Sequence, residues 1–170
     1  MQLFIKDIIL LTGCLLCGLF FHACQQTEEP SLSERIFAER PEIEAYAASQ
    51  GLEGLFNFDG VYVVTETEGD TATSFPTSSS FIKLAYVGSL LNGEIFSQAD
   101  TSGLRTPGGE LPQLNDLIPG LESGLKLFRK SGKGTLIIPS PLGYEEFGST
   151  DGKVPADAIL RFEIELVDFE

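Results

Sequence analysis

Residues 117–144 read LIPGLESGLKLFRKSGKGTLIIPSPLGY, and this stretch decides the fold because it joins a helical pattern to a short strand. Residues 117–130 carry apolar side chains at helical spacing on one stripe: Leu117, Leu121, Leu125 and Phe128, with Ile118 beside them. A small, polar break follows, and residues 135–138 then form a strand pattern that ends at Pro-Ser-Pro. Because a lone helix of this length is marginal in water, we expect a sheet to cover its apolar stripe.

Strand patterns lie on both sides of this helix. Residues 60–67, 81–91 and 94–98 are rich in β-branched and aromatic side chains, and Asn92-Gly93 predicts a hairpin between the last two segments. Residues 158–167 alternate between apolar side chains and Arg161, Glu163 and Glu165, which indicates an antiparallel strand with one dry and one wet face. The pattern predicts an α+β domain whose sheet packs its dry face on Leu121, Leu125 and Phe128.

Length and charge limit the classes of function. The chain has 170 residues, 42% of them hydrophobic, which is enough for one packed domain and a targeting segment. Its formal net charge of −14 argues against nucleic acid as a partner, and a solvated acidic surface is the simpler use of that charge. We expect a monomer.

The N-terminus has the features of an export signal. Residues 8–21 form an apolar run that is shorter than the roughly 20 residues a membrane-spanning helix needs. The run ends at His22-Ala23-Cys24, which resembles a bacterial lipobox, so we expect a signal peptide at residues 1–23 and lipidation of Cys24. Cys14 has a similar local motif but a shorter preceding run, and a plain signal peptide or short anchor is the alternative. The expected location is the bacterial cell envelope, lipid-anchored and facing the periplasm or the exterior.

Cleavage before Cys24 would leave a mature chain with no other Cys, no His and no Met. A cysteine nucleophile, a Ser–His–Asp triad and a His-ligated zinc would then all be excluded. No Asp/Glu set has the spacing of an EF-hand. We therefore expect neither a metal site nor a cofactor.

The segment between the signal and the helix described first divides into two parts. Residues 24–35 are polar and acidic and indicate a tether. Residues 36–80 form an N-terminal extension in which we expect a helix at 41–49, begun by Pro41 and stopped by Gly51, followed by a strand. Residues 81–170 then form the principal domain.

Six short motifs in this domain follow one another in a familiar order. They are Ala85-Tyr86-Val87-Gly88; Leu91-Asn92-Gly93-Glu94-Ile95-Phe96; Leu117-Ile118-Pro119-Gly120-Leu121; Gly124-Leu125 with Gly132-Lys133; Ile138-Pro139-Ser140 with Gly143-Tyr144; and Val154-Pro155-Ala156 with residues 160–166. Each is weak alone, but together they resemble the FKBP-type peptidyl-prolyl isomerase domain over residues 81–168.

The resemblance implies an antiparallel sheet of five to six strands curled around one short helix, with a proline pocket between them. It places pocket positions at Tyr86, Phe96, Ile118, Tyr144 and Phe162, and further substrate contacts at Leu117, Leu121, Ser97 and Val154. Ile118 would donate its backbone N–H to one substrate carbonyl, Tyr144 its hydroxyl to another, and Leu121 would form the floor. The implied partners are proline-containing polypeptide segments, with macrolide ligands as a further possibility.

The sequence departs from the family pattern at several positions in and around the pocket. The aromatic residue usual in the loop before the helix has no clear match, and Leu111 is the nearest apolar candidate. Ser97 stands where the family has an Asp, Leu121 where it has a Trp, and Glu145 where it has a Gly. Two hypotheses follow: an isomerase that helps exported proteins fold, with activity weakened at Ser97 and Leu121, or a catalytically weak or inactive relative that binds proline-containing segments as a chaperone or scaffold.

Overall fold

The computed structural model describes residues 29–170. The predicted signal peptide, Cys24 and the first part of the tether lie outside the described residues. In chain order the main elements are α2 (Leu32–Ser49), β1 (Leu55–Phe56), β2 (Tyr62–Thr67), β3 (Ile82–Leu90), β4 (Ile95–Ala99), α3 (Pro119–Leu125), β5 (Gly132–Ile138) and β6 (Leu160–Phe169). Three short 3-10 helices lie in the connections: η1 (Leu114–Asp116), η2 (Ser140–Leu142) and η3 (Glu145–Phe147).

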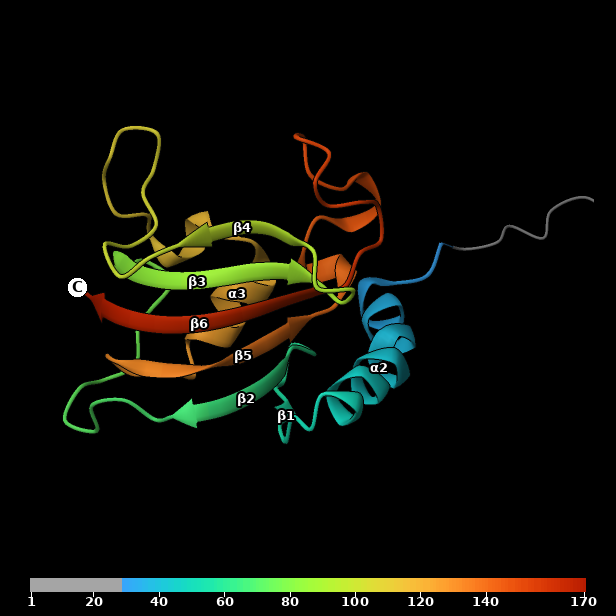
Figure 1. Ribbon diagram of the computed structural model, residues 1–170, viewed down its shortest axis with the longest axis horizontal. Coiled ribbons are helices and arrows are strands. Elements are labelled where there is room, and N and C mark those ends of the chain that lie inside the picture. The colour runs from blue at the N-terminus through green and yellow to red at the C-terminus, as the bar shows by residue number, and fades with distance from the viewer. Residues whose placement is uncertain (1–28) are drawn as a thin grey trace, which may run out of the picture. The chain divides into compact units, whose positions relative to one another are not determined.

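The strands form one six-stranded sheet in the order β1-β2-β5-β6-β3-β4, with every neighbouring pair antiparallel. Figure 1 shows α3 lying across one face of this sheet, while α2 lies at one end of it. The predicted α+β fold, with its antiparallel sheet around one short helix, is confirmed. The extension contributes β1 and β2, so its strands belong to the same sheet.

The core between α3 and the sheet is the one the helical stripe predicted. Leu121, Leu125 and Phe128 are buried in a cluster with side chains from the sheet, including Leu84, Leu136, Ile138, Leu160, Phe162 and Leu166. Gly124 permits this close packing, because a Cβ at that position would come 2.6 Å from the Leu136 side chain. The contact between α3 and β5 therefore depends on a helix residue with no side chain.

The helix α3 is shorter than the predicted range of 117–130. It begins at Pro119, a residue suited to the first helical position, and ends at Leu125. Gly120 and Gly124 have low helix propensity, and the chain turns after Leu125 so that Phe128 enters the core fully buried. The periodicity thus predicted the buried face correctly but overestimated the length of the helix.

The helix α2 is longer than predicted. It begins at Leu32, not at Pro41, because Ser31 and Glu34 form a capping box: the Ser31 hydroxyl accepts from the Glu34 amide and the Glu34 carboxylate accepts from the Ser31 amide. Pro41 lies inside the helix, where it removes one backbone donor. The predicted tether at 24–35 therefore overlaps the first turn of α2.

A second, smaller core fixes α2 to the other face of the sheet. Ile43 and Ala47 of α2 are buried against Tyr62, Val64 and Ile137. The strand β5 is consequently buried on both faces, since Leu136 and Ile138 face α3 while Ile137 faces α2. Within the described part of the chain, no helix is long and apolar enough to cross a membrane.

The predicted strands are all present, with ends displaced by a few residues. The strand expected at 158–167 spans Leu160–Phe169, and the one expected at 60–67 spans Tyr62–Thr67. The two-residue strand β1 was not predicted, because a segment of that length carries no periodic signal.

Candidate active site at the start of α3

Four aromatic rings of the main hydrophobic cluster contact one another. The ring of Phe96 (β4) lies edge-on to Phe162 (β6), with centroids 5.6 Å apart, and edge-on to Tyr144 at 6.3 Å. The ring of Tyr86 (β3) lies 5.7 Å from that of Phe162. These separations are typical of favourable aromatic pairs. Four residues far apart in the sequence thus form one aromatic wall.

Gly88 makes this wall possible. It pairs with Phe162 across β3 and β6, and a Cβ at Gly88 would lie 2.8 Å from the Phe162 ring and 2.9 Å from the Phe96 ring. The two rings therefore occupy the space that any side chain at position 88 would need. Gly88 was noted only as part of a motif, and its role in the packing becomes apparent from the structure alone.

Ser97 holds the Tyr86 side chain in place. The two hydroxyl groups lie 2.7 Å apart and form a hydrogen bond, and both side chains are half-buried. The residue that replaces the family's Asp therefore keeps a contact with the tyrosine, although a neutral hydroxyl is a weaker partner than a carboxylate.

The start of α3 packs against the same hydrophobic cluster. Ile118 is the N-cap residue, in an extended conformation, and its carbonyl accepts hydrogen bonds from the amides of Leu121 and Glu122 at 3.0 and 3.1 Å. Its own amide donates to no group within residues 29–170. An N–H at the start of a helix is a ready donor for an incoming carbonyl.

The predicted site residues come together in this region. Ser97 joins it through the Tyr86 hydroxyl, and the other eight belong to one hydrophobic cluster, either buried in it or packed against it: Tyr86, Phe96, Leu117, Ile118, Leu121, Tyr144, Val154 and Phe162. Val154 reaches the cluster from the connection before β6, where its amide donates to the Ser149 hydroxyl at 2.8 Å. The same cluster continues into the core under the sheet.

Tyr144 is half-buried, and its hydroxyl makes no hydrogen bond to a group in the described residues. Burial raises the pKa of the Tyr144 phenol above its ordinary value, and the nearby Tyr86 and Asp151 add to that shift. The phenol consequently keeps its proton at neutral and moderately alkaline pH. Tyr144 can therefore serve as a hydrogen-bond donor there.

The residue after Tyr144 has a strained backbone. Glu145 has φ of 54°, in the left-handed region that favours glycine. This is the position at which the family pattern has a Gly. A glycine would adopt this backbone conformation without the strain that a Cβ brings.

Two contacts that hold the Tyr144 loop against α2 could not be predicted from the sequence. Glu39 accepts hydrogen bonds from both the backbone N–H and the hydroxyl of Ser140, and Arg35 pairs with Glu146 at 3.1 Å. The partners are separated by more than a hundred positions in the chain, so no local motif could have revealed them.

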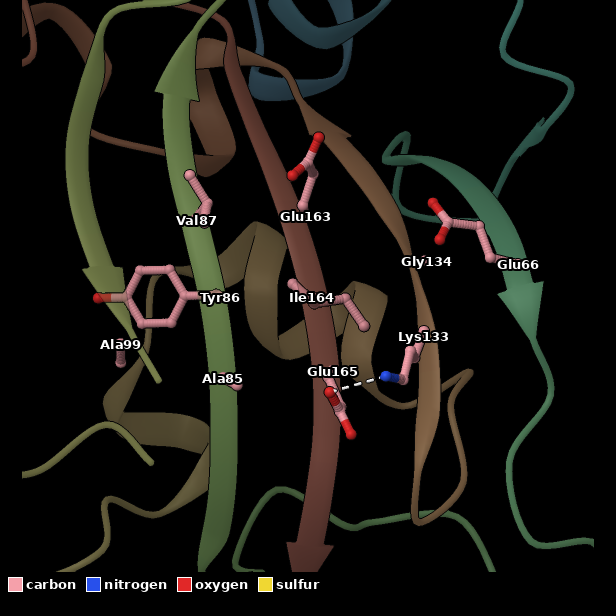
Figure 2. A pocket seen from close by; sticks show the side chains of 10 residues that line it. All are labelled: Glu66, Ala85, Tyr86, Val87, Ala99, Lys133, Gly134, Glu163, Ile164 and Glu165. Atoms are coloured by element: carbon pink, nitrogen blue, oxygen red, sulfur yellow. Dashed lines mark ion pairs between the residues drawn. The ribbon is translucent and has the colours of Figure 1, made fainter. Parts of the chain in front are cut away.

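The other face of the sheet carries a concavity of about 420 Å³, drawn in Figure 2, and Tyr86 is among the residues that line it. Its rim is charged: Glu66, Glu163 and Glu165 lie around Ala85 and Val87, and Lys133 pairs with Glu165 at 3.0 Å. It is an open, solvated surface with a single cation among its carboxylates. Among residues 29–170, no three His, Cys, Asp or Glu side chains are grouped so that they could hold a metal ion.

Known proteins resemble this chain in sequence. The sequence family described as FKBP-type peptidyl-prolyl cis-trans isomerase matches residues 72–167. FkpA of Buchnera aphidicola subsp. Schizaphis graminum is 43% identical over 95 residues, which are 55% of this chain and 35% of that protein. FkpA of Escherichia coli K12 is 33% identical over 108 residues, 64% of this chain and 37% of that protein. The chain spans about a third of the length of these curated relatives.

Solved structures show the same fold. A peptidyl-prolyl cis-trans isomerase from Pseudomonas syringae pv. tomato superposes with a TM-score of 0.61 at 26% identity, covering 84% of this chain and 98% of that one. The crystal structure of FkpA from Escherichia coli gives a TM-score of 0.63 at 25% identity, covering 82% of this chain and 62% of that one. Since the family match takes in more than half of the chain and carries the aromatic wall, this chain belongs to the FKBP-type peptidyl-prolyl cis-trans isomerase family.

Proposed function

We propose that this protein is a peptidyl-prolyl cis-trans isomerase that acts on proline-containing segments of polypeptides. The observation that carries the proposal is the aromatic wall of Tyr86, Phe96, Tyr144 and Phe162, within the residues that match the family. Ile118 packs against the same hydrophobic cluster, and its amide has no hydrogen-bond partner within residues 29–170. An apolar surface next to two hydrogen-bond donors is the arrangement that this reaction requires.

The reaction breaks no covalent bond. Rotation about the peptide bond costs about 18–20 kcal/mol because amide resonance is lost in the twisted state. Without a catalyst an X–Pro bond exchanges in tens of seconds or more. The twisted amide has less charge separation than the planar one, so a surface that excludes water favours it. A thousandfold acceleration needs only about 4 kcal/mol of such preference.

Each part of the site has a role in this mechanism. The proline ring would lie against Phe96 and Phe162, with Leu121, Leu117 and Val154 completing the apolar surface. The Ile118 amide would hold one substrate carbonyl and the Tyr144 hydroxyl another, so that the chain on both sides of the proline is fixed while the amide turns. No step requires a proton transfer, a metal or a cofactor.

The Ser97 and Leu121 positions set the expected level of activity. Ser97 polarises Tyr86 less than a carboxylate would, and Leu121 offers a smaller floor than an indole. We expect turnover that is reduced but present, because the hydrogen bond to Tyr86 and the aromatic packing are both retained. Binding of macrolides at the same surface should be weak for the same reason.

The biological setting of the proposal comes from the N-terminal signal. With residues 1–23 removed and Cys24 acylated, the domain would be held at a membrane of the bacterial envelope and would assist the folding of exported proteins. Replacement of Cys24 by Ser should release the protein from the membrane fraction, while the Cys14→Ser variant should stay bound. Release of both variants, or of neither, would contradict lipidation at Cys24.

A protease-coupled assay with a proline-containing peptide tests the activity. The full chain in detergent should accelerate isomerisation in proportion to its concentration. The Tyr144→Phe variant should lose about tenfold in kcat/KM, which corresponds to one hydrogen bond of about 1.4 kcal/mol. If the peptide binds but isomerises no faster than in buffer alone, the binding-only alternative is favoured and the proposed activity is contradicted.

A further inference from the structure

The helix α2 lies outside the residues that match the family, yet it contacts the segment that carries Tyr144. The family match covers residues 72–167, whereas α2 spans Leu32–Ser49. Figure 1 shows α2 beside the orange-to-red connection between β5 and β6, and α2 packs against η2 in that connection. Tyr144 follows η2 and precedes η3 directly, so both of its flanks are within reach of α2.

The first contact is at Ser140, two residues after the end of β5. Ser140 is 1% exposed, and both of its donors point to Glu39: the backbone N–H lies 2.7 Å from Oε2, and the hydroxyl donates to Oε1. A bidentate acceptor of this kind fixes both the position and the orientation of the residue it binds. Without Glu39, two buried donors would lack a partner, a situation that folded proteins avoid by moving the backbone.

A second contact holds the other end of the segment. Arg35 pairs with Glu146 in η3 at 3.1 Å, through a bond that is partly exposed and therefore weaker. Arg35 and Glu39 are four positions apart on α2, so one face of the helix contacts the segment before Tyr144, at Ser140, and after it, at Glu146.

Four backbone bonds shape the Tyr144 segment: the Leu142 amide donates to the Pro139 carbonyl, the Gly143 amide to that of Ser140, the Gly148 amide to that of Tyr144, and the Asp157 amide to that of Glu145. The first two lie in η2, the turn that begins at Ser140. The Tyr144 ring contacts the Phe96 ring edge-on. Because the Tyr144 hydroxyl has no hydrogen-bond partner among residues 29–170, its direction follows from this backbone and from the ring contact.

We propose that Glu39 is a positioning residue for Tyr144, and that α2 is therefore part of the working site although it lies outside the family domain. Glu39 holds Ser140, Ser140 fixes the start of the turn, and the turn directs the Tyr144 hydroxyl to the substrate carbonyl. This inference rests on the proposed isomerase function, but the placement of the Tyr144 ring can be measured without any turnover.

The test uses the full chain in detergent with 13C-labelled tyrosine rings. The chain has four tyrosines, Tyr46, Tyr62, Tyr86 and Tyr144, which Tyr→Phe variants assign. In the Glu39→Ala variant the Tyr144 signal should broaden or lose the shift that the Phe96 ring gives it, while the Tyr62 and Tyr86 signals stay in place. We expect kcat/KM to fall about tenfold, as small misplacements of a catalytic group do.

Three further variants separate positioning from loss of fold. Glu39→Gln keeps one acceptor oxygen and should show an intermediate loss. In the double variant Glu39→Ala/Ser140→Ala, kcat/KM should fall no further than in Glu39→Ala alone, because both substitutions remove the same contact. Glu44 lies on an exposed face of the same helix, so Glu44→Ala is the matched control. It should have the kcat/KM and the Tyr144 signal of the wild type.

Two results would overturn the inference. Unchanged Tyr144 signals in Glu39→Ala, with kcat/KM within twofold of the wild type, would show that Glu39 has no part in placing the ring. Movement of all the tyrosine signals together would show that Glu39 only supports the fold. A wild type that fails to accelerate proline exchange would instead contradict the proposed function, and the ring signals would still decide whether Glu39 places Tyr144.

Discussion

The Tyr86 hydroxyl lies 2.7 Å from the Ser97 hydroxyl, and this bond joins the two strands that carry the outer part of the aromatic wall. The contact is made by a neutral hydroxyl at a position where the family resemblance implies a carboxylate. It sets the orientation of Tyr86, whose ring packs on Phe162. The strength of this one bond is therefore a measurable determinant of how well the site works.

Restoring the charge at this position should raise activity. In Ser97→Asp a carboxylate would accept from the Tyr86 hydroxyl, and such charge-assisted bonds are roughly twice as strong as neutral ones. We expect a severalfold gain in kcat/KM for a proline peptide. Asn is close to Asp in size but carries no charge, so Ser97→Asn should show no gain in kcat/KM. An equal response of the two variants would mean that charge at position 97 does not limit the reaction.

A side chain at position 88 should damage the aromatic wall. Gly88→Ala would place a Cβ 2.8 Å from the Phe162 ring and 2.9 Å from the Phe96 ring, so both rings must move. Overpacking of this kind costs about 1–3 kcal/mol in the free energy of unfolding, and we expect a loss in kcat/KM as well. Denaturant titration and the peptide assay measure the two effects.

Gly108→Ala is the control for that substitution. A Cβ at Gly108 would have only the Thr106 hydroxyl nearby, at 3.8 Å. This variant should retain its stability and its activity. If Gly88→Ala behaved in the same way, the rings would not be held as tightly as the structure indicates.

Glycine at position 145 should stabilise the fold. Glu145 has φ of 54°, a conformation that costs a residue with a Cβ about 1–2 kcal/mol. Glycine removes this cost, but its greater flexibility in the unfolded chain offsets part of the gain. We expect Glu145→Gly to raise the free energy of unfolding by roughly 0.5–1 kcal/mol. Glu145→Ala removes the same charge but keeps the Cβ, so it should bring no such gain. A gain in both variants would assign the effect to charge instead of backbone strain.

The pKa of Tyr144 predicts a pH dependence. Burial raises that pKa above the ordinary value of a tyrosine, about 10, so the folded protein holds the proton more tightly than the unfolded chain does. The contribution to stability is complete below pH 10 and is lost as the pH rises through the higher pKa of the folded state. Hydrogen-bond donation by Tyr144 should likewise persist up to that range.

Two measurements follow for Tyr144. The ring signal of 13C-labelled Tyr144 should not titrate below pH 10, whereas an exposed tyrosine such as that in a short peptide titrates near 10. The loss of kcat/KM in Tyr144→Phe should be constant between pH 6 and 9. Titration of Tyr144 below pH 10 would contradict the burial that the structure gives it.

Much of the fold could be predicted from periodicity, because burial imposes it locally. The stripe of Leu121, Leu125 and Phe128 and the alternation in β6 each reflect one dry face, and both were identified correctly. The length of α3 was overestimated because periodicity measures the buried face and does not register where backbone hydrogen bonding ends. The start of α2 was missed although the Ser31–Glu34 capping box was visible in the sequence.

The candidate site was only partly predictable. The ordered motifs indicated Tyr86, Phe96, Ile118, Tyr144 and Phe162, and the structure brings these residues together. Their catalytic roles stay predictions. The sequence could not indicate that Glu39 holds Ser140, because a contact between segments so far apart depends on how α2 packs on the sheet. Family motifs identify residues within the family domain. They give no information on contacts made by a segment outside it.

The central claim is that the aromatic wall and its two donors accelerate rotation of an X–Pro bond. Exchange spectroscopy on a proline peptide at equilibrium measures this most directly, because the same spectra report binding and the cis–trans exchange rate. With catalytic amounts of the full chain, we expect exchange at the X–Pro bond to quicken in proportion to protein concentration, and Tyr144→Phe to be about tenfold less effective. Peptide signals that shift on binding while the exchange rate stays at its uncatalysed value would contradict the claim.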